Sequence, residues 1–352
     1  MSVERFFRKE LLEMPAYHLA EHDGVKLNQN EAPWDLPVPL KALGVEALLK
    51  TPWNRYPLGD TLLLKKKLAK HLGIWADNLV IANGSNVLIQ ALVMATSIDR
   101  NILTFDPTFS VYELEANLFN NTVVRVPLNE EDFSIPEDLT LRAIKKFKPS
   151  LIFIANPNAP TGNLFDISLL KKIIAIAPGL VVIDEAYYPF SGTTMIDSVR
   201  EYENLVVLRT FSKAFALGGL RLGYVVCETD VARNLEKCLL PFCVSKIIAS
   251  LAMVVLDHAE YINQYVKTIC SERERVYEGL KHISSIKVYP SQANFILFQV
   301  ENSEKVFKSL LKEKVIIRQV SNGRSLTNAL RVSIGTPEEN DAFLSSLTKV
   351  LA

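Results

Sequence analysis

The sequence predicts an α/β fold: a large domain with a mainly parallel seven-stranded sheet covered by helices, joined to a small α+β domain. Seven short apolar runs, rich in Val, Ile and Leu, alternate with stretches of helical periodicity, which is typical of a parallel sheet buried on both faces. After about residue 230 the pattern changes to longer helical segments and then to the strand-like stretches "IKVYPSQANFILFQV" and "ALRVSIGT".

A chain of 352 residues is long enough for two domains that share an interface. We assign residues 46–240 to the large domain, and residues 1–45 and 241–352 to an N-terminal arm and a small C-terminal domain. The proline-rich stretch "NEAPWDLPVPL" is typical of an extended arm and linker.

The strands of the large sheet are predicted from the apolar runs. In chain order they are residues 79–82, 101–105, 122–128, 151–155, 180–184, 205–209 and 223–226. Helical periodicity follows several of them, as in "VLIQALVMATS" after the first and "ISLLKKIIAIA" after the fourth. Because ligands of such sheets bind beyond the carboxyl ends of the strands, we expect the functional residues there.

Composition and charge argue against several classes of partner. Basic and acidic residues number 39 each and no long basic run occurs, so nucleic acid is not an expected partner. The four cysteines lack C-x-x-C spacing, which argues against a zinc ribbon or a disulfide framework and fits a reducing cytoplasm. The N-terminus lacks an apolar signal, and no stretch approaches the roughly 18 apolar residues of a membrane span. We therefore expect a cytoplasmic protein that binds small molecules.

Polar clusters follow five of the predicted strands. Asn83-Gly84-Ser85-Asn86 opens a helix after the first strand, which would point backbone N–H groups at an anion such as phosphate, although an ordinary turn with an N-cap has the same pattern. An acid that ends an apolar strand needs a partner, because an unpaired buried carboxylate is costly. The other clusters contain Phe109 and Tyr112, the "NPNAPTGN" stretch 156–163, Asp184 to Tyr187, and Thr210, Ser212, Lys213 and Arg221.

Together these clusters fit a planar, phosphorylated, cationic heteroaromatic aldehyde, namely pyridoxal 5′-phosphate. A lysine amine captures its aldehyde, an aspartate pairs with its protonated ring nitrogen, and a helix N-terminus with hydroxyls and an arginine holds its phosphate. Lys213 is the predicted amine, and Thr210, Ser212 and Arg221 are the predicted phosphate ligands. The glycines near Lys213 would let the backbone approach closely.

Over nearly its whole length, the sequence resembles the fold-type I aminotransferases and, within them, the histidinol-phosphate aminotransferases. The shared motifs occur in the family's order: "LNQNEAP", "NRYPLGD", "NGSNVLIQAL", "DPTFSVY", "NPNAPTG", "VIDEAYYPF", "RTFSKAFALGGLRLGY" and "ALRVSIGTPEEN". The resemblance implies transamination between histidinol phosphate and 2-oxoglutarate, giving imidazole-acetol phosphate and glutamate, in histidine biosynthesis.

The resemblance also implies roles for individual residues. Lys213, Asp184 and Tyr187 would be catalytic, with Asp184 on the ring nitrogen and Tyr187 on the ring hydroxyl. Further cofactor contacts would come from Gly84, Ser85, Asn86, Phe109 and Asn158, and across a homodimer from Tyr56 of the neighbouring subunit. Substrate contacts would come from Tyr17, Asn30, Arg318 and Arg331, although a surface cation would also fit Arg318.

The sequence departs from the family at one position and leaves alternatives open. Ala159 stands where relatives often have an asparagine that bonds the ring hydroxyl, so Asn158, a water molecule or Tyr187 alone would serve there. An aromatic or broad-specificity aminotransferase, or a threonine-phosphate decarboxylase, would share the cofactor residues. The "HLAEH" stretch, residues 18–22, fits a zinc peptidase pattern but lies in the arm, so no metal site is expected.

Overall fold

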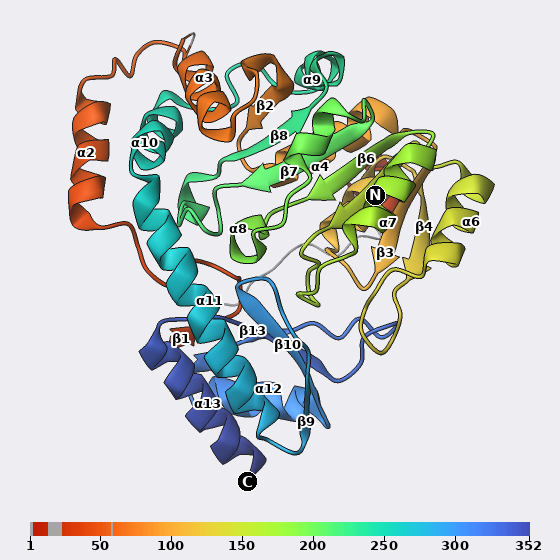
Figure 1. Ribbon diagram of the computed structural model, residues 1–352, viewed down its shortest axis with the longest axis vertical. Helices are drawn as coiled ribbons and strands as arrows, with labels where there is room; N and C mark the ends of the chain where they lie inside the picture. The colour runs from red at the N-terminus through yellow and green to blue at the C-terminus, as the bar shows by residue number, and fades with distance from the viewer. Residues whose placement is uncertain (1–2, 13–22, 58) are drawn as a thin grey trace.

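The computed structural model describes residues 3–12, 23–57 and 59–352, and its centre is a mixed sheet of seven strands (Figure 1). The strand order across the sheet is β2-β8-β7-β6-β5-β3-β4. This confirms the predicted fold class and each predicted strand. The bounds are β2 (Leu79–Ala82), β3 (Asn101–Asp106), β4 (Thr122–Pro127), β5 (Leu151–Ala155), β6 (Leu180–Asp184), β7 (Leu205–Thr210) and β8 (Gly223–Cys227).

Only β8 runs against its neighbours in this sheet. It pairs antiparallel with β2 and β7, while the pairs among β3, β4, β5, β6 and β7 are parallel. The register sets Gly223, the first residue of β8, opposite Ala82 and Thr210, which end β2 and β7. The carboxyl ends of the other strands and the start of β8 therefore meet at one edge.

Helices cover both faces because successive strand residues point to opposite sides. In β5, Leu151, Phe153 and Ala155 pack toward one face, whereas Ile152 and Ile154 pack toward the other. The first face is covered by α4 (Ser85–Thr96), α5 (Val111–Leu118) and α9 (Thr229–Glu236). The second is covered by α3 (Asp60–Leu72), α6 (Glu137–Phe147) and α7 (Ile167–Ile176).

A smaller α+β unit lies at the lower end of the molecule in Figure 1. Its antiparallel sheet has the order β12-β13-β10-β9, with bounds β9 (Ile286–Val288), β10 (Phe295–Val300), β12 (Arg318–Gln319) and β13 (Ala329–Ser333). Helices α11 (Ala259–Lys281), α12 (Ser303–Lys312) and α13 (Pro337–Leu351) pack with it. The N-terminal segment joins this unit where β1 (Val25–Lys26) pairs with β11 (Val315–Ile316).

The remaining helices connect these parts. Helix α10 (Lys246–Asp257) packs against α2 (Val38–Leu49) and α3. It lies beyond residue 240, the predicted end of the large domain, whereas α3 lies within that domain. The domain boundary at residue 240 therefore stays a prediction. The short elements are η1 (Val3–Phe6), α1 (Lys9–Leu12), η2 (Ala76–Asn78), α8 (Tyr188–Ser191), η3 (Ile196–Arg200) and η4 (Gly218–Leu220). No helix within the described ranges is long and apolar enough to cross a membrane.

The tip of the β12–β13 hairpin touches the large unit. The Asn322 side-chain amide donates to the Asp106 carboxylate at 3.0 Å, and the Arg324 guanidinium lies 3.3 Å from the Glu113 carboxylate. Asp106 ends β3 and Glu113 lies in α5, so both acceptors belong to the rim where the strands end.

We predict that Gly223→Ala lowers the free energy of unfolding by about 1–3 kcal/mol, because a Cβ there would collide with the backbone of Gly84 and Ser85. Thermal or urea unfolding measures the effect. Gly219→Ala is the matched control, since nothing lies within 4 Å of its added Cβ, and it should stay within about 0.5 kcal/mol of the wild type. Equal stability of the two variants would contradict the close packing of β8 on α4.

Candidate active site

Asp184 ends β6 inside the protein, with only 6% of its surface exposed. The Tyr112 hydroxyl donates to its Oδ2 at 2.7 Å, and the Ala186 backbone N–H donates to its Oδ1 at 3.0 Å. Burial raises the pKa of Asp184 to about 6, while these two hydrogen bonds act to lower it. The carboxylate is therefore held in one orientation and can pair with a protonated ring nitrogen.

Lys213 follows β7 and carries an amine of unusual acidity. Its Nζ donates to the Gln29 backbone carbonyl at 2.8 Å. Burial, together with the positive charge of Arg331, lowers the pKa of Lys213 to about 7, and the negative charge of Glu31 opposes the shift. A large fraction of the amine is then neutral near pH 7, which is the form that attacks a carbonyl.

Tyr187 lies close to both groups. Its buried hydroxyl accepts a hydrogen bond from the Asn30 side-chain amide at 2.9 Å, and its ring centre is 5.8 Å from the Lys213 Nζ. Asn30 is itself fixed, because its backbone N–H donates to the Ser333 hydroxyl at 2.8 Å and that hydroxyl donates back to Asn30 Oδ1 at 3.0 Å. The small unit thereby positions a residue of the N-terminal segment beside the tyrosine.

The start of α4 offers a cradle for an anion. Gly84 caps the helix with φ of 92°, and no side chain caps the first turn, so its N–H groups are available. A Cβ on Gly84 would lie 2.9 Å from the Arg221 guanidinium, which also donates to the Ser212 hydroxyl at 3.2 Å. A helix terminus, a guanidinium and a hydroxyl thus converge, and this donor set fits the phosphate of pyridoxal phosphate.

The other predicted phosphate contacts are Ser85, Asn86 and Thr210. Ser85 is half-buried and Asn86 is exposed in the first turn of α4. The Thr210 hydroxyl accepts from the Ser212 backbone N–H at 3.1 Å and lies 3.4 Å from the Leu222 carbonyl, so it stabilises the loop that carries Lys213.

Phe109 and Asn158, two further predicted cofactor residues, differ in their contacts within the protein. Phe109 is half-buried and makes an edge contact with the Tyr112 ring, with centres 5.5 Å apart. Asn158 is fully buried, and its amide donates to the Pro107 carbonyl at 3.0 Å and the Thr161 hydroxyl at 2.7 Å. Both partners belong to the surrounding turns, so the Asn158 amide stabilises the protein here and its cofactor contact stays a prediction.

Tyr56 is not brought to this cluster within its own chain. Tyr56 is 72% exposed and stacks on Phe242 with ring centres 4.7 Å apart. Tyr17 lies outside the described residues, as does the "HLAEH" stretch. Within the described ranges, no group of three or more His, Cys, Asp or Glu could hold a metal ion.

Arg318 and Arg331 face each other directly across the β12–β13 hairpin. Arg331 donates to the Asn28 backbone carbonyl at 3.0 Å and lies over the Phe295 ring at 5.2 Å. Like charges in opposed strand positions destabilise a sheet, so an anion between them would be favourable. Such a pair suits a ligand that carries a carboxylate or a phosphate dianion.

Two contributors to the site were missed from the sequence. Tyr112 was expected near the rim, but its hydrogen bond to Asp184 was not. Ser333 is the second: it lies two residues after Arg331 and therefore on the same face of β13. The two-residue spacing between Arg331 and Ser333 is the sequence signal that indicates this shared face.

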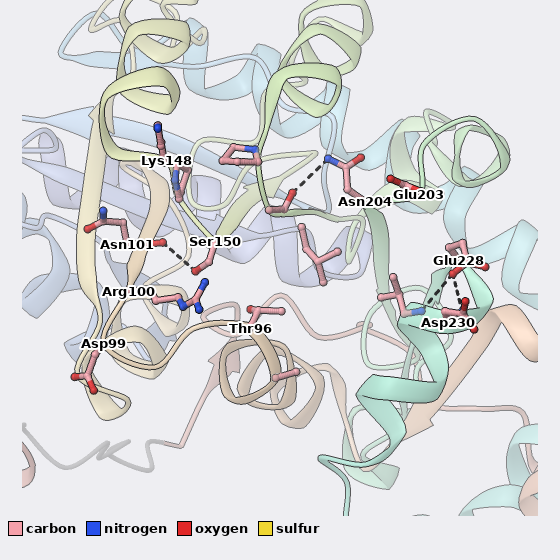
Figure 2. A pocket seen from close by; sticks show the side chains of 16 residues that line it. Thr96, Asp99, Arg100, Asn101, Lys148, Ser150, Glu203, Asn204, Glu228 and Asp230 are labelled. Carbon is pink, nitrogen blue, oxygen red and sulfur yellow. Dashed lines mark hydrogen bonds between the residues drawn. The ribbon is translucent and has the colours of Figure 1, made fainter.

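An open pocket of about 1010 Å³ lies at the opposite edge of the sheet, near the amino ends of β3, β5 and β6 (Figure 2). Asp99, Arg100, Lys148, Glu203 and Glu228 are among its lining residues. None of the buried unpartnered polar atoms found in the described chain belongs to it, so we assign it no ligand.

The family model for class I and II aminotransferases matches residues 22–347. A histidinol-phosphate aminotransferase of Deinococcus radiodurans is 36% identical over 344 residues, covering 97% of this chain and 95% of that protein. Histidinol-phosphate aminotransferase 1 of Carboxydothermus hydrogenoformans is 38% identical over 358 residues, covering 100% of both.

Solved structures agree with the fold. The histidinol-phosphate aminotransferase of Clostridium acetobutylicum superimposes with a TM-score of 0.85 at 26% identity, covering 92% of this chain and 98% of that one. That of Sinorhizobium meliloti, solved with pyridoxal 5′-phosphate, has a TM-score of 0.86 at 21% identity, covering 98% and 97%. At the latter identity the likeness concerns the fold alone.

We predict that Tyr112→Phe raises the pKa of Asp184 above about 6, because the hydroxyl that favours the carboxylate is lost. The acidic limb of the pH–activity profile should then move to higher pH by about 1 unit. Tyr289→Phe, which removes a hydroxyl bonded to Gln299 in the small unit, should leave the profile in place. An unmoved limb in the Tyr112 variant would contradict the assigned contact.

The lowered pKa of Lys213 also predicts how stability depends on pH. Between pH 7 and 10.5 the unfolded chain binds a proton at this amine that the folded chain lacks, so wild-type stability falls as the pH is lowered across that range. In cofactor-free protein, Lys213→Met should therefore be more stable than the wild type near pH 7, by on the order of 1–3 kcal/mol, and this difference should shrink toward pH 10.5. Urea unfolding at several pH values measures it, with Lys66→Met at an exposed position as control. A pH-independent difference would show that the amine is not perturbed.

Proposed function

We propose, for a chain that belongs to the class I and II aminotransferase family, that it transfers the amino group of L-histidinol phosphate to 2-oxoglutarate, giving imidazole-acetol phosphate and L-glutamate. The observation that carries this proposal is the direct opposition of Arg318 and Arg331 across the β12–β13 hairpin. Their planar guanidinium groups would receive a carboxylate in one half-reaction and a phosphate in the other. Relatives named histidinol-phosphate aminotransferase, which align over 97% and 100% of this chain, support it.

Pyridoxal phosphate, when bound, supplies an electron sink for the bond electrons released at the substrate Cα. Asp184 would hold the proton on the ring nitrogen, and Tyr187 would donate to the ring hydroxyl. The Lys213 amine would bond to the cofactor between turnovers and, once displaced by substrate, carry the proton away from Cα. The lowered pKa of Lys213 suits this task, because the base must be neutral to accept that proton.

Separate groups would hold the phosphate of the cofactor and the anionic groups of the substrates. The first turn of α4, Ser212 and Arg221 would bind the cofactor phosphate, and Phe109 would lie against the ring. Arg331 would bind the glutamate carboxylate, and Arg318 would add charge for the phosphate dianion of histidinol phosphate. Asn30 and Ser333 would keep the Tyr187 hydroxyl oriented.

We propose that the active unit is a homodimer in the cytoplasm. Tyr56 is exposed and stacks on Phe242, as expected of a residue that reaches a neighbouring subunit. Exposed apolar side chains also occur on α2, α3 and α10, which pack together, and in the adjoining segments: Val38, Val45, Leu49, Trp53, Leu62, Leu63, Leu240, Phe242 and Ile247. All four cysteines are free thiols, which fits a reducing compartment.

A threonine-phosphate decarboxylase is the second candidate, since it too would need cations for a phosphorylated amino acid. The L-threonine-O-3-phosphate decarboxylase of Porphyromonas gingivalis has a TM-score of 0.79 to this chain at 21% identity, a likeness of fold alone. An aromatic aminotransferase would keep the same cofactor groups and change only the side-chain pocket.

The deciding experiment is an absorbance titration of the cofactor-loaded enzyme with histidinol phosphate, glutamate, phenylalanine and threonine phosphate, each added alone. We expect low concentrations of histidinol phosphate, and also glutamate, to bleach the visible absorbance band of the lysine-bound cofactor. Addition of 2-oxoglutarate should restore the band. A tighter response to phenylalanine would assign the aromatic class, and carbon dioxide release from threonine phosphate would assign the decarboxylase. Failure to form the band with pyridoxal phosphate would contradict the cofactor assignment.

We predict that Arg318→Ala raises the KM for histidinol phosphate about tenfold, the effect of losing one charge-assisted contact, and changes the KM for glutamate by less than about threefold. Steady-state kinetics with each substrate varied measures both values. Arg331→Ala is the comparison and should weaken both substrates. Equal losses in the Arg318 variant would mean that it makes no phosphate-specific contact.

Mixing two inactive variants tests whether Tyr56 acts across the dimer. In a hybrid of Tyr56→Ala and Lys213→Ala subunits, one site would combine the wild-type lysine of one chain with the wild-type tyrosine of the other. We expect co-expressed hybrids to recover about a quarter to a half of wild-type activity, since at most one of the two sites is intact. No recovery, in hybrids verified by mass, would place Tyr56 with its own chain's site.

A further inference from the structure

A buried ion pair between Glu185 and Arg209 takes no part in the chemistry proposed above, yet each partner adjoins a residue of the candidate site. Glu185 follows Asp184 at the end of β6, and Arg209 precedes Thr210 at the end of β7. Only 1% of the Glu185 side chain and 3% of the Arg209 side chain are exposed to solvent. The pair therefore joins, inside the protein, the two strand ends that carry the predicted catalytic residues.

The contacts of this pair leave little freedom to either side chain. Arg209 Nε and Nη2 both donate to Glu185 Oε2, at 3.0 and 2.8 Å, and Nη2 also donates to the Thr194 hydroxyl at 2.7 Å. The remaining oxygen, Glu185 Oε1, accepts from the Met195 backbone N–H at 2.5 Å. Two strands and the segment after α8 are thus fixed by one cluster.

The guanidinium is also fixed from one face. Arg209 Cζ lies 3.5 Å from the centre of the Tyr188 ring, a stacked cation–π contact. Tyr188 is the immediate neighbour of Tyr187, whose hydroxyl points to the site. Asp184 and Tyr187 of this turn therefore belong to the candidate site, whereas Glu185 and Tyr188 of the same turn contact Arg209.

A buried ion pair is weak support for stability by itself, because the cost of removing two charges from water offsets most of their attraction. Apolar residues of similar volume often replace such a pair without loss. The contact does, however, fix geometry, since two N–H groups of the planar guanidinium converge on one carboxylate oxygen while Thr194 and Met195 hold the other polar atoms. The main effect of this ion pair is therefore on the arrangement of the residues that it holds in place.

Charge gives a second reason for the pair. Asp184 and Glu185 are adjacent buried carboxyls, and the negative charge of Glu185 acts to raise the pKa of Asp184. Tyr112, Tyr187 and Lys213 are the other titratable groups that interact with Asp184. Arg209 faces Glu185, Tyr188, Tyr224 of β8 and His71 of α3, so it is the cation that offsets the Glu185 charge.

We propose that Glu185 and Arg209 are a positioning pair for the cofactor: they lock the Asp184–Tyr187 turn to the Thr210–Lys213 loop, and Arg209 neutralises Glu185 so that Asp184 can stay ionised against the ring nitrogen. The pair fixes the distance between the group that binds the ring nitrogen and the amine that binds the aldehyde. This inference rests on the proposed function only through pyridoxal phosphate, and not on the identity of the substrate.

The test compares four variants: Arg209→Met, Arg209→Lys, Glu185→Gln and the double variant Glu185→Gln/Arg209→Met. Lys349→Met, which breaks the exposed Lys349–Glu313 pair of the small unit, is the control. Three properties are measured: the melting temperature of cofactor-free protein, the Kd for pyridoxal phosphate by fluorescence quenching, and the pH midpoint of the bound cofactor's absorbance change.

We expect the double variant to melt within a few degrees of the wild type, because no uncompensated charge is left buried, yet to bind the cofactor about tenfold more weakly. Arg209→Met should raise the absorbance midpoint by about 1 pH unit, since a less ionised Asp184 leaves the ring nitrogen less protonated and the lysine-bound cofactor then keeps its own proton to higher pH. Arg209→Lys should retain the midpoint while losing affinity, because it keeps the charge without the fork.

A double variant that binds pyridoxal phosphate like the wild type, together with an unchanged midpoint in Arg209→Met, would reduce the pair to an ordinary structural contact. If the double variant does not fold, an Arg209→Lys variant with wild-type affinity would overturn the positioning role equally. Absence of cofactor binding in the wild type would instead reject the proposed function, and the two failures are therefore distinguishable.

Discussion

A concentration of positive charge around one buried amine governs this site. Burial is the largest cause that lowers the pKa of Lys213, and the positive charges of Arg331 and Arg221 add to it. Asp184 and Glu31 compensate only in part, and backbone carbonyls of the N-terminal segment accept from Lys213 and Arg331. A ligand with anionic groups at both ends relieves this excess of charge, so the same electrostatics that keep the amine neutral also select phosphorylated and carboxylated partners.

The fold supplies this arrangement by bringing distant segments to one edge. Parallel strands end together, which places Asp184 beside the loop after β7. The small unit contributes its arginines from a hairpin whose tip contacts Asp106 and Glu113 on the rim. Buried polar contacts such as Tyr112 to Asp184 then set the direction of individual side chains, which hydrophobic packing alone leaves open.

The strands were predictable because residues buried on both faces of a sheet leave continuous apolar runs in the sequence, as in "LIFIA" and "LVVID". The strand-end residues were predictable because such strands share a direction. Side-chain partners were not: the Tyr112–Asp184 bond and the Glu185–Arg209 pair depend on which strands are neighbours and on helix placement. The inward turn of Asn158 depends equally on tertiary contacts with Pro107 and Thr161, which no local pattern encodes.

The reversed direction of β8 has a consequence for how the site could change over evolution. The chain leaves β7 at Thr210 and enters β8 at Gly223 on the same edge of the sheet, so residues 211–222 never cross to the other side. Lys213 and Arg221 therefore belong to one short covalent segment, and the separation between the amine and the proposed phosphate ligand is set by the length of a loop instead of by the packing of two elements. Substitutions elsewhere can reshape the substrate side while this spacing is inherited as a unit.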